Sequence, residues 1–525
     1  VVVNPEVCEG CGDCGVESNC LSVIPHETEL GRKRKIDQSA CNKDYSCLKG
    51  FCPSFVTVTG GQLKKNKADQ SISWPTLPEP VIAPMQVRPW NIVVTGVGGT
   101  GVLTIAAVVA MAAHIEGKGC ATMNQTGLAQ KFGAVVSHVR VGIDQQSINA
   151  VRIPAGDADL LLGCDLVVTA GDEAIAKVDV ERSHAVVNDF SAATAEFISD
   201  PDAQIPKAAM KALIETEVGL TKTCFLEATD LATRLLGDSI ASNMFLLGYA
   251  LQNGLIPVSR GALEEAIRLN GVSIDFNLEA LEWGRRAALD LHGVEQAAGL
   301  RQAFKPLTDV DEIIADRAAR LTDYQSSDYA AEYVAFIESV RAVDDSARDF
   351  ALTRVIARSL YKLMAYKDEY EVARLYTNGQ FAEYIGNLFE GDYKFNFHLA
   401  PPLLSKRDRA TGKPRKRKFP GLVLGLFKLL APFKFLRGTP FDLLGYTRDR
   451  VLERQTLAEF RQIFAGLRDA LTPDNYRTAL EIAELPMLVR GYGYVKSNNL
   501  LAVNIRKEIL LKRFRGELIP LAVEV

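Results

Sequence analysis

The sequence predicts a multidomain protein that combines α+β and α/β domains with a mostly helical C-terminal domain. Three observations lead to this prediction. Seven of the ten cysteines lie within the first 52 residues. A β-rich run leads into a glycine turn and a helix near residue 100, and beyond about residue 304 the apolar residues recur with helical spacing. At roughly 100–200 residues per domain, a chain of 525 residues has room for three or four domains.

The composition excludes a disordered or fibrous chain, since 47% of the residues are hydrophobic and 24% are charged. The 60 Lys and Arg against 64 Asp and Glu leave a net charge of −4, so we expect no nucleic-acid partner. The longest uncharged stretch, residues 92–113, is interrupted by four glycines, which argues against a transmembrane segment. No secretory leader opens the chain, which favours a cytoplasmic location. The chain starts at Val1 rather than Met, and we expect it to be a piece of a longer protein.

The N-terminal cysteines form two spaced runs. The first has the spacing C-x2-C-x2-C-x5-C and the second C-x2-D-x2-C-x4-C-P, with a carboxylate in place of the middle thiol. The residues are Cys8, Cys11, Cys14 and Cys20 in the first run, and Cys41, Asp44, Cys47 and Cys52 in the second. Both runs are modified forms of the bacterial ferredoxin pattern C-x2-C-x2-C-x3-C-P. We therefore expect residues 1–60 to form a ferredoxin-like iron–sulfur domain of the α+β class.

Disulfide bonds or a zinc ion could also account for such a group of thiols. The number of cysteines in the group is odd and no export signal precedes it, which argues against disulfides. Two C-x2-C pairs could hold a zinc ion. Three thiols at steps of three, however, suit a cluster of several irons better than a single ion.

In ferredoxin-type runs, the fourth cysteine of each run binds the cluster held by the other run. This rule divides the candidate ligands into two sites. An all-cysteine site for a [4Fe–4S] cluster consists of Cys8, Cys11, Cys14 and Cys52. A second cluster, of the [4Fe–4S] or [3Fe–4S] type, is expected at Cys20, Cys41, Asp44 and Cys47. Because a carboxylate is a hard donor and iron in such clusters prefers thiolates, the iron at Asp44 should be the most labile. The alternative is that Asp44 is a solvated turn residue beside a three-cysteine, three-iron site.

A linker and then a glycine turn follow the cysteines. Residues 61–89 carry five prolines without helical or strand periodicity, which is typical of a tether. A buried strand at 91–95 then leads into the turn G-V-G-G-T-G and a helix at 102–113, an arrangement that can hold a phosphate at the start of the helix. The candidate binding residues are Gly96, Gly98, Gly99, Thr100 and Gly101.

The glycine turn has three possible roles, which differ in what it binds. A nicotinamide or flavin dinucleotide is disfavoured, because no acidic residue for a ribose lies between Glu116 and Asp144. The turn could hold a mononucleotide-like or coenzyme A phosphate. Its glycines could also serve only the tight packing of strand against helix.

The α/β pattern continues to about residue 295. β-rich runs at 135–141, 165–170, 185–189 and 224–229 alternate with helical windows such as 207–217, which predicts a mostly parallel sheet in a Rossmann-like domain spanning 90–295. His138 and Arg140 lie on the first of these runs. We expect His138 to be a satisfied core residue rather than a catalytic one. The six histidines belong to no recognisable hydrolytic arrangement, and no catalytic residue is predicted.

The remaining segment, 296–525, is expected to be mostly helical, with an amphipathic helix around 352–363. Two basic segments stand out in the chain. Residues 31–35 could dock an acidic electron carrier, but a solvated loop tip is the commoner structure for such a run. Residues 406–418 hold eight basic residues and precede the apolar stretch 421–436, which could dock on a membrane surface or a partner; a solvated loop before a packed helix is the simpler interpretation.

Taken together, the two cysteine runs and the turn G-V-G-G-T-G-V resemble the bacterial indolepyruvate:ferredoxin oxidoreductases, members of the 2-oxoacid:ferredoxin oxidoreductase family. The α/β part resembles the γ domain of that family, and the helical tail resembles the extension of its long bacterial members. The matching positions are 96–101, 127–133 before the strand 135–141, Asn243-Met244 with Gly248, 277–280 before Gly284, and 370–376 in the tail.

The resemblance implies oxidative decarboxylation of an aryl 2-oxo acid, with coenzyme A accepting the acyl group and ferredoxin the electrons. Thiamine diphosphate performs the carbon chemistry in this family, and its Gly-Asp-Gly motif is absent from the 525 residues. The chain is therefore expected to be the electron-transfer and γ portion of an oligomeric enzyme, with the thiamine-binding domains or subunits as partners, and to be inactive in decarboxylation alone. The alternatives are a stand-alone iron–sulfur electron-transfer protein and an NAD(P)H-linked reductase with a partner-binding α/β domain.

Overall fold

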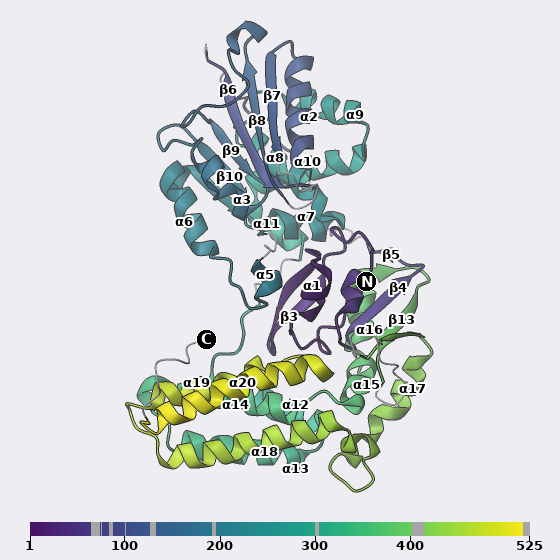
Figure 1. Cartoon of the computed structure of the whole chain (residues 1–525). Helices are drawn as coiled ribbons and strands as arrows, with labels where there is room; N and C mark the ends of the chain where they lie inside the picture. The colour runs from purple at the N-terminus through teal and green to yellow at the C-terminus, as the bar shows by residue number, and fades with distance from the viewer. Residues whose placement is uncertain are drawn as a thin grey trace. The chain divides into compact units, whose positions relative to one another are not determined.

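The computed structural model describes residues 1–64, 74, 76–82, 88–99, 101–126, 133–191, 196–299, 304–401 and 414–517. The chain forms two compact units (Figure 1). The α/β unit consists of residues 63–197 and 203–302. The second, which we call the cysteine–helix unit, consists of residues 1–62, 198–202 and 303–525. The segment expected as an N-terminal domain and most of the expected C-terminal extension therefore belong to one compact unit.

A six-stranded sheet forms the centre of the α/β unit. Its strands are β6 (Trp90–Val97), β7 (Gly119–Thr126), β8 (Ala134–Gly142), β9 (Leu160–Gly163), β10 (His184–Asn188) and β11 (Thr223–Leu226). Their spatial order is β11-β10-β9-β6-β8-β7. The first four strands in this order are parallel, whereas β8 pairs antiparallel with both β6 and β7. The expected mostly parallel sheet is confirmed, with an antiparallel pair at one edge.

Helices cover this sheet, and Figure 1 shows α2 beside strands β7 and β8. The helices of this part of the chain are α2 (Val102–Ile115), α3 (Leu166–Thr169), α4 (Asp172–Ile175), α5 (Glu196–Ser199), α6 (Lys207–Val218), α7 (Ala228–Leu236), α8 (Ser242–Gln252), α9 (Arg260–Asn270), α10 (Ile274–Leu289) and α11 (Leu291–Ala297). Strands β6 and β8 are buried almost throughout, because apolar side chains on both faces meet these helices.

The expectation of a strand at 165–170 is wrong. This run begins a short helix, α3, because the Asp165 carboxylate accepts a hydrogen bond from the N–H of Val168 at 3.0 Å and caps its first turn. The strand lies just before it, at Leu160–Gly163. A short apolar run fits a buried strand and a buried helix equally well, so the pattern alone could not separate them.

Two glycines allow helices α8 and α10 to cross with their backbones in contact. A Cβ atom on Gly284 would lie 1.8 Å from the carbonyl oxygen of Phe245, and one on Gly248 would lie 2.0 Å from that of Leu281. Such distances leave no room for any side chain. The described part of the expected linker packs on the same helices, since Trp74 meets Trp283 edge-on at 5.5 Å between ring centroids.

The cysteine–helix unit contains an antiparallel sheet in the order β1-β4-β13-β14. Its strands are β1 (Val2–Val3), β4 (Phe55–Thr59), β13 (Lys394–Leu399) and β14 (Arg417–Pro420); other strands are β2 (Val23–Thr28), β3 (Gly31–Ile36), β5 (Gln62–Leu63) and β12 (Phe389–Glu390). Strands from the N-terminal segment and from residues 394–420 therefore share one sheet, which no local pattern indicated.

Helices dominate the rest of this unit, as expected for 296–525. They are α1 (Asp13–Ser18), α12 (Val310–Tyr324), α13 (Ser327–Arg341), α14 (Ala351–Met364), α15 (Glu369–Thr377), α16 (Gln380–Leu388), α17 (Val423–Leu430), α18 (Arg448–Asp469), α19 (Tyr476–Leu488) and α20 (Gly493–Phe514). The expected amphipathic helix is α14, which buries Leu352, Ile356 and Leu360 against its neighbours. In Figure 1, α12, α13, α14, α18, α19 and α20 lie together as a bundle.

The interpretation of residues 31–35 as a solvated loop tip is wrong. They lie on strand β3, which pairs with β2, and Lys33 and Arg34 are only 7% and 2% exposed. The second basic segment lies partly outside the described residues, which resume at Pro414. In the helix that follows, α17, Phe427 is buried whereas Leu426 and Leu429 are exposed.

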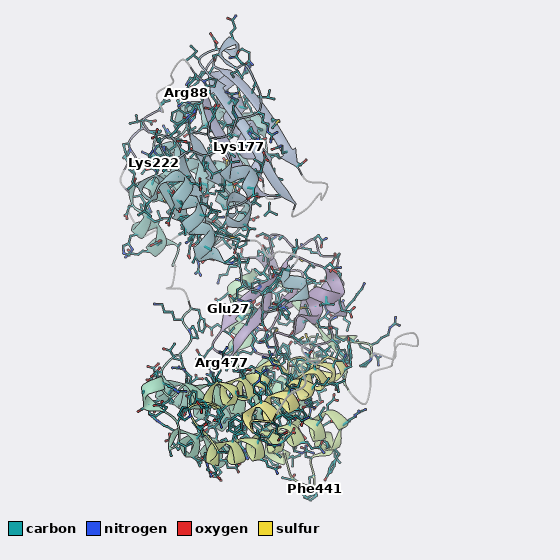
Figure 2. All side chains as sticks on the ribbon, turned by 60° about the vertical axis from the view of Figure 1, so that its left-hand side comes forward. Glu27, Arg88, Lys177, Lys222, Phe441 and Arg477 are labelled. Carbon is teal, nitrogen blue, oxygen red and sulfur yellow. The ribbon has the colours of Figure 1, made fainter. Side chains whose placement is uncertain are left out.

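Phe441, which follows helix α17 in the sequence, is 76% exposed, and its side chain projects outward (Figure 2). In the part of the chain that the structure describes, every helix is too short or too polar to cross a membrane.

Candidate functional site

The first group of thiols forms where α1 and a short 3-10 helix, Ser46–Lys49, approach each other. Cys8 and Cys14 are buried, and Cys11 and Cys52 are half-buried. The approach requires Gly50, because a Cβ atom there would lie 2.6 Å from the Cα of Cys14. Burial raises the pKa of Cys14, and the neighbouring Cys52, Cys8 and Cys11 raise it further. The four side chains of the expected all-cysteine set therefore lie close enough to interact.

The second group of thiols consists of Cys20, Cys41 and Cys47. Burial raises the pKa of Cys47 to about 12, and Cys20 and Cys41 contribute to the shift. Asp44 is also near enough to act on Cys47, but its side chain is exposed. Its Oδ1 accepts hydrogen bonds from the N–H and the hydroxyl of Ser46 at 2.9 and 2.8 Å, and these bonds lower the pKa of Asp44. In this geometry Asp44 shapes a turn beside the three thiols.

Cations surround the first thiol group. Arg34 of β3 interacts electrostatically with Cys14, Cys8 and Cys11, and Lys416 interacts electrostatically with Cys52 and Cys14. The ammonium of Lys416 donates to the carbonyl of Gly50 and lies over the ring of Phe55, 4.9 Å from its centroid. The two basic segments of the sequence thus each supply one cation to this site. Sequence reasoning missed both, because nothing in a run of basic residues indicates which member turns inward.

Thiolates are the ligands of iron–sulfur clusters, so the donor set of both groups fits the expected clusters, which stay a prediction. Among the described side chains, no three His, Cys, Asp or Glu are placed to hold one ion together. Each thiolate of a cubane cluster binds a different iron, so cluster ligands are spaced more widely than the ligands of one ion. The N–H of Gly10 donates to Sγ of Cys8 at 3.3 Å, and bonds of this kind together with nearby cations stabilise a negatively charged cluster.

The glycine turn is shaped by packing at two of its positions. A Cβ atom on Gly96 would lie 2.6 Å from Cγ2 of Val102, and one on Gly101 would lie 2.7 Å from Nδ2 of Asn243. Gly99 has a φ of +86° and open space beside it, while the N–H of Gly98 donates to the carbonyl of Gly133 at 2.7 Å. The remaining candidate, Thr100, lies outside the described residues, as do residues 127–132. Close packing therefore explains both glycines without a ligand: strand β6 meets helix α2 at Gly96, and the start of α2 meets helix α8 at Gly101.

His138 is a satisfied core residue, as expected. Its Nδ1 accepts the N–H of Ile153 at 3.3 Å, which leaves the proton on Nε2 to donate to Oε1 of Gln125 at 3.2 Å. Burial, with smaller contributions from Lys177 and Arg152, lowers the pKa of His138 from 6.5 to about 4. Arg140 is held in the same way, by Oδ1 of Asn91 at 2.9 Å.

We predict that the α/β unit loses stability between pH 6.5 and pH 4 because of His138. The unfolded chain binds the proton first as the pH falls, so the stabilisation is complete above pH 6.5 and is lost toward pH 4. After allowance for solvent screening, the loss should be about 2 kcal/mol. The free energy of unfolding, followed by tryptophan fluorescence at both pH values, measures it. His138→Gln should reduce the pH dependence, while His184, whose pKa burial also lowers, keeps its own share, and His292→Gln, at an exposed position, should not reduce it; equal pH dependence in the His138→Gln and His292→Gln variants would contradict the assignment.

Comparison with known proteins finds a matching family model for each of two segments of the chain. Residues 91–287 match the family model described as pyruvate ferredoxin/flavodoxin oxidoreductase, and residues 310–508 match a family of unknown function, DUF6537. The chain is 30% identical to indolepyruvate oxidoreductase subunit IorB of Thermococcus kodakarensis over 212 residues, which is 40% of this chain and 100% of that protein. The same subunit of Pyrococcus horikoshii is 29% identical over 209 residues, 39% of this chain and 98% of that protein.

A solved structure, that of pyruvate oxidoreductase subunit PORC from Thermotoga maritima, is 20% identical, with a TM-score of 0.28 over 38% of this chain and 96% of that one. The identity of 30% to the Thermococcus protein, along that protein's whole length, is what establishes the relationship. The chain therefore belongs to the family of indolepyruvate oxidoreductase subunit IorB.

Proposed function

We propose that this chain is the electron-transfer and γ portion of an indolepyruvate:ferredoxin oxidoreductase. In the whole enzyme an aryl 2-oxo acid and coenzyme A would give acyl-CoA, carbon dioxide, a proton and two electrons. The two electrons would leave through this chain, one at a time, to ferredoxin. The observation that carries the proposal is the similarity to indolepyruvate oxidoreductase subunit IorB in a chain that also holds two groups of buried and half-buried thiols.

The residues that would hold the clusters follow from the two groups. A [4Fe–4S] cluster would be held by Cys8, Cys11, Cys14 and Cys52, and a second cluster of three or four irons by Cys20, Cys41 and Cys47 with Asp44. Such clusters exchange single electrons, which is chemistry that amino-acid side chains do not supply. Arg34 and Lys416 would offset the negative charge of the first cluster, and burial of Cys8 and Cys14 would keep water from it.

The carbon chemistry would take place outside this chain. Thiamine diphosphate would be bound by a partner subunit or domain, because the Gly-Asp-Gly motif does not occur in the 525 residues. The IorB relatives are named as subunits, which supports a partner for this chain too. Ferredoxin would be the electron acceptor, and an oligomeric complex would be the active form.

The test is reconstitution with defined electron donors. The anaerobically purified chain is mixed with indolepyruvate, thiamine diphosphate, coenzyme A and a viologen dye, and dye reduction is followed. We expect no reduction by the chain alone, and reduction when a thiamine-binding partner of the same enzyme is added. Turnover by the chain alone would refute the division of labour. Dye reduction by NADH without thiamine would instead favour an NAD(P)H-linked reductase.

We predict that Asp44→Cys changes the electron paramagnetic resonance spectrum of the oxidised protein. With a carboxylate at this position the fourth iron is held weakly, so the second cluster should be found in the three-iron form after exposure to air. A thiolate holds that iron firmly, and the signal of the three-iron form should decrease in the variant. The spectrum of the oxidised, anaerobically reconstituted protein is the measurement.

Asp44→Asn is the matched control for this substitution, because its amide oxygen can still accept the hydrogen bonds of Ser46 while the carboxylate is lost. If neither variant differs from the wild type, Asp44 is only a turn residue and does not control the iron count.

A further inference from the structure

The cysteine–helix unit contains a second feature, a cavity of about 390 Å³ between the β2–β3 hairpin and helices α12, α14 and α15. Its size is that of a small-molecule site. Ten of the side chains that line it are Lys or Arg and six are Asp or Glu, and three of the cations, Arg320, Arg490 and Lys496, form ion pairs with carboxylates outside the lining. The aromatic rings of Phe304, Tyr361 and Tyr366 also line it, so the cavity offers both charge and flat apolar surface.

Four of the six acidic residues of the lining are each paired with one lining cation, which leaves Lys33, Arg358 and Lys362 as the lining cations without an ion pair among the described residues. Two of these three cations are held by backbone carbonyls: Arg358 donates to Leu307 at 2.5 Å, and Lys362 donates to Met487 at 3.0 Å. The four ion pairs, each 2.6 or 2.7 Å long, are Glu9–Lys367, Glu27–Arg32, Glu29–Arg317 and Glu371–Arg374.

Lys33 is a lining residue for which the fold supplies no ion-pair partner. It is 7% exposed, and within the described ranges its ammonium forms no hydrogen bond and no ion pair. Glu9, Cys8 and Glu6 interact with Lys33 electrostatically, but neither carboxylate forms an ion pair with it, and that of Glu9 pairs with Lys367. A buried charge without a partner destabilises the folded state. The cost is offset if a ligand brings the missing negative charge.

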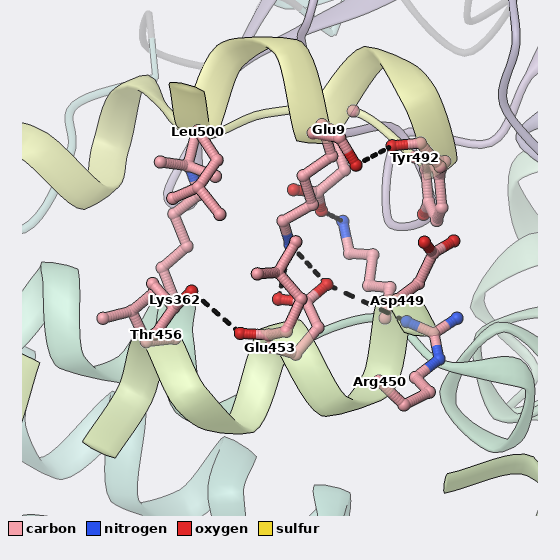
Figure 3. Close-up of a pocket in the computed structure, with 16 residues that line it drawn as sticks. Glu9, Lys362, Asp449, Arg450, Glu453, Thr456, Tyr492 and Leu500 are labelled. Carbon is pink, nitrogen blue, oxygen red and sulfur yellow. Dashed lines mark hydrogen bonds and ion pairs between the residues drawn. The ribbon is translucent and has the colours of Figure 1, made fainter. Parts of the chain in front are cut away.

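A smaller cavity of about 40 Å³ in the same unit provides a comparison, because a lysine that lines it is paired with a carboxylate. Figure 3 shows Lys362, Glu9 and Glu453 among the side chains around it. There the ammonium of Lys496 meets both carboxylate oxygens of Glu453, at 2.7 and 2.8 Å. Lys33 has no such carboxylate within the described part of the chain, although it belongs to the larger cavity next to these residues.

We propose that the larger cavity is a binding site for a small phosphorylated organic molecule, whose phosphate lies against Lys33 and whose organic part packs on the aromatic rings. Among the described residues, Lys33, Arg358 and Lys362 are the lining cations without an ion pair, which favours an anionic ligand, and guanidinium groups such as that of Arg358 match phosphate oxygens in geometry. This site uses none of the candidate cluster ligands, although Lys33 lies near one of them, Cys8.

The test uses the full anaerobically purified chain and inorganic pyrophosphate as the probe. Isothermal titration calorimetry should show saturable binding to the wild type, and Lys33→Gln should weaken it about tenfold or more. Lys33→Gln should also raise the melting temperature without pyrophosphate, since it removes an unpaired buried charge. Lys35→Gln is the matched control: it lies two residues along the same strand, outside the cavity lining, and should bind as the wild type does.

Each other result counts against the proposal. Absence of binding to the wild type, or equal binding to Lys33→Gln, overturns it, as does citrate binding more tightly than pyrophosphate. Lys33 also lies near Cys8. If Lys33→Gln changes the visible spectrum or the reduction potential of the clusters and leaves pyrophosphate binding intact, Lys33 serves the cluster and not an anion. Arg358→Gln, which should weaken binding in the same way, provides the test if Lys33→Gln does not fold.

Discussion

Replacing Cys14 by alanine is expected to remove about half of the iron and acid-labile sulfide from the anaerobically purified chain. Cys14 is 7% exposed and lies among Cys8, Cys11 and Cys52, so its loss leaves the first site with three ligands around a buried volume. The second group, on other residues, should keep its cluster. Chemical analysis of iron and sulfide together with the visible absorption spectrum measures the effect.

The matched control is Cys164→Ala. Cys164 is also 7% exposed but belongs to the α/β unit, outside both thiol groups. Its replacement should leave the iron content unchanged, because a buried cysteine there only packs among apolar side chains. Full iron content in Cys14→Ala, or an equal loss in Cys164→Ala, would show that the first group of thiols does not hold a cluster.

Replacing Gly284 by alanine is expected to lower the free energy of unfolding of the α/β unit by about 3 kcal/mol or more. The new methyl group would lie 1.8 Å from the carbonyl oxygen of Phe245, a backbone atom that cannot turn aside as a side chain can. Helices α8 and α10 must separate, and the buried apolar residues between them lose contact.

Denaturation followed by tryptophan fluorescence reports on this unit alone, because all three tryptophans, Trp74, Trp90 and Trp283, belong to it. The matched control is Gly261→Ala in helix α9, where a Cβ atom would have no neighbour within 4 Å. That substitution should be neutral or stabilising by up to about 1 kcal/mol, since alanine favours a helix more than glycine does. A Gly284→Ala variant as stable as Gly261→Ala would mean that the two helices do not cross as closely as the structure has them.

Features that depend on the spacing of residues along the chain could be predicted from the sequence. The steps between cysteines separated the thiols into two groups, and the structure places the members of each group near one another. Buried strands at 91–95, 135–141 and 185–189 were predicted from short β-rich runs, and the helix at 352–363 from its 3.6-residue period. The run 165–170 failed, because one capping carboxylate decides between a strand and a helix there.

Contacts between distant parts of the chain could not be predicted from the sequence. The sheet that joins Val56 of β4 to Phe397 of β13, and the crossing of α8 over α10, depend on pairing and packing that no window of the sequence contains. The same holds for Lys33, which reads as one member of a solvated basic run and is in fact buried without an ion-pair partner among the described residues.

The sequence by itself therefore determined the chemistry that the chain carries: thiols at the spacing of iron–sulfur ligands, a glycine turn between strand and helix, and a helical tail. Only the tertiary structure decided which of the many basic residues are buried, because burial depends on how the whole chain packs. A charged side chain destabilises the folded state only when that packing excludes water from it.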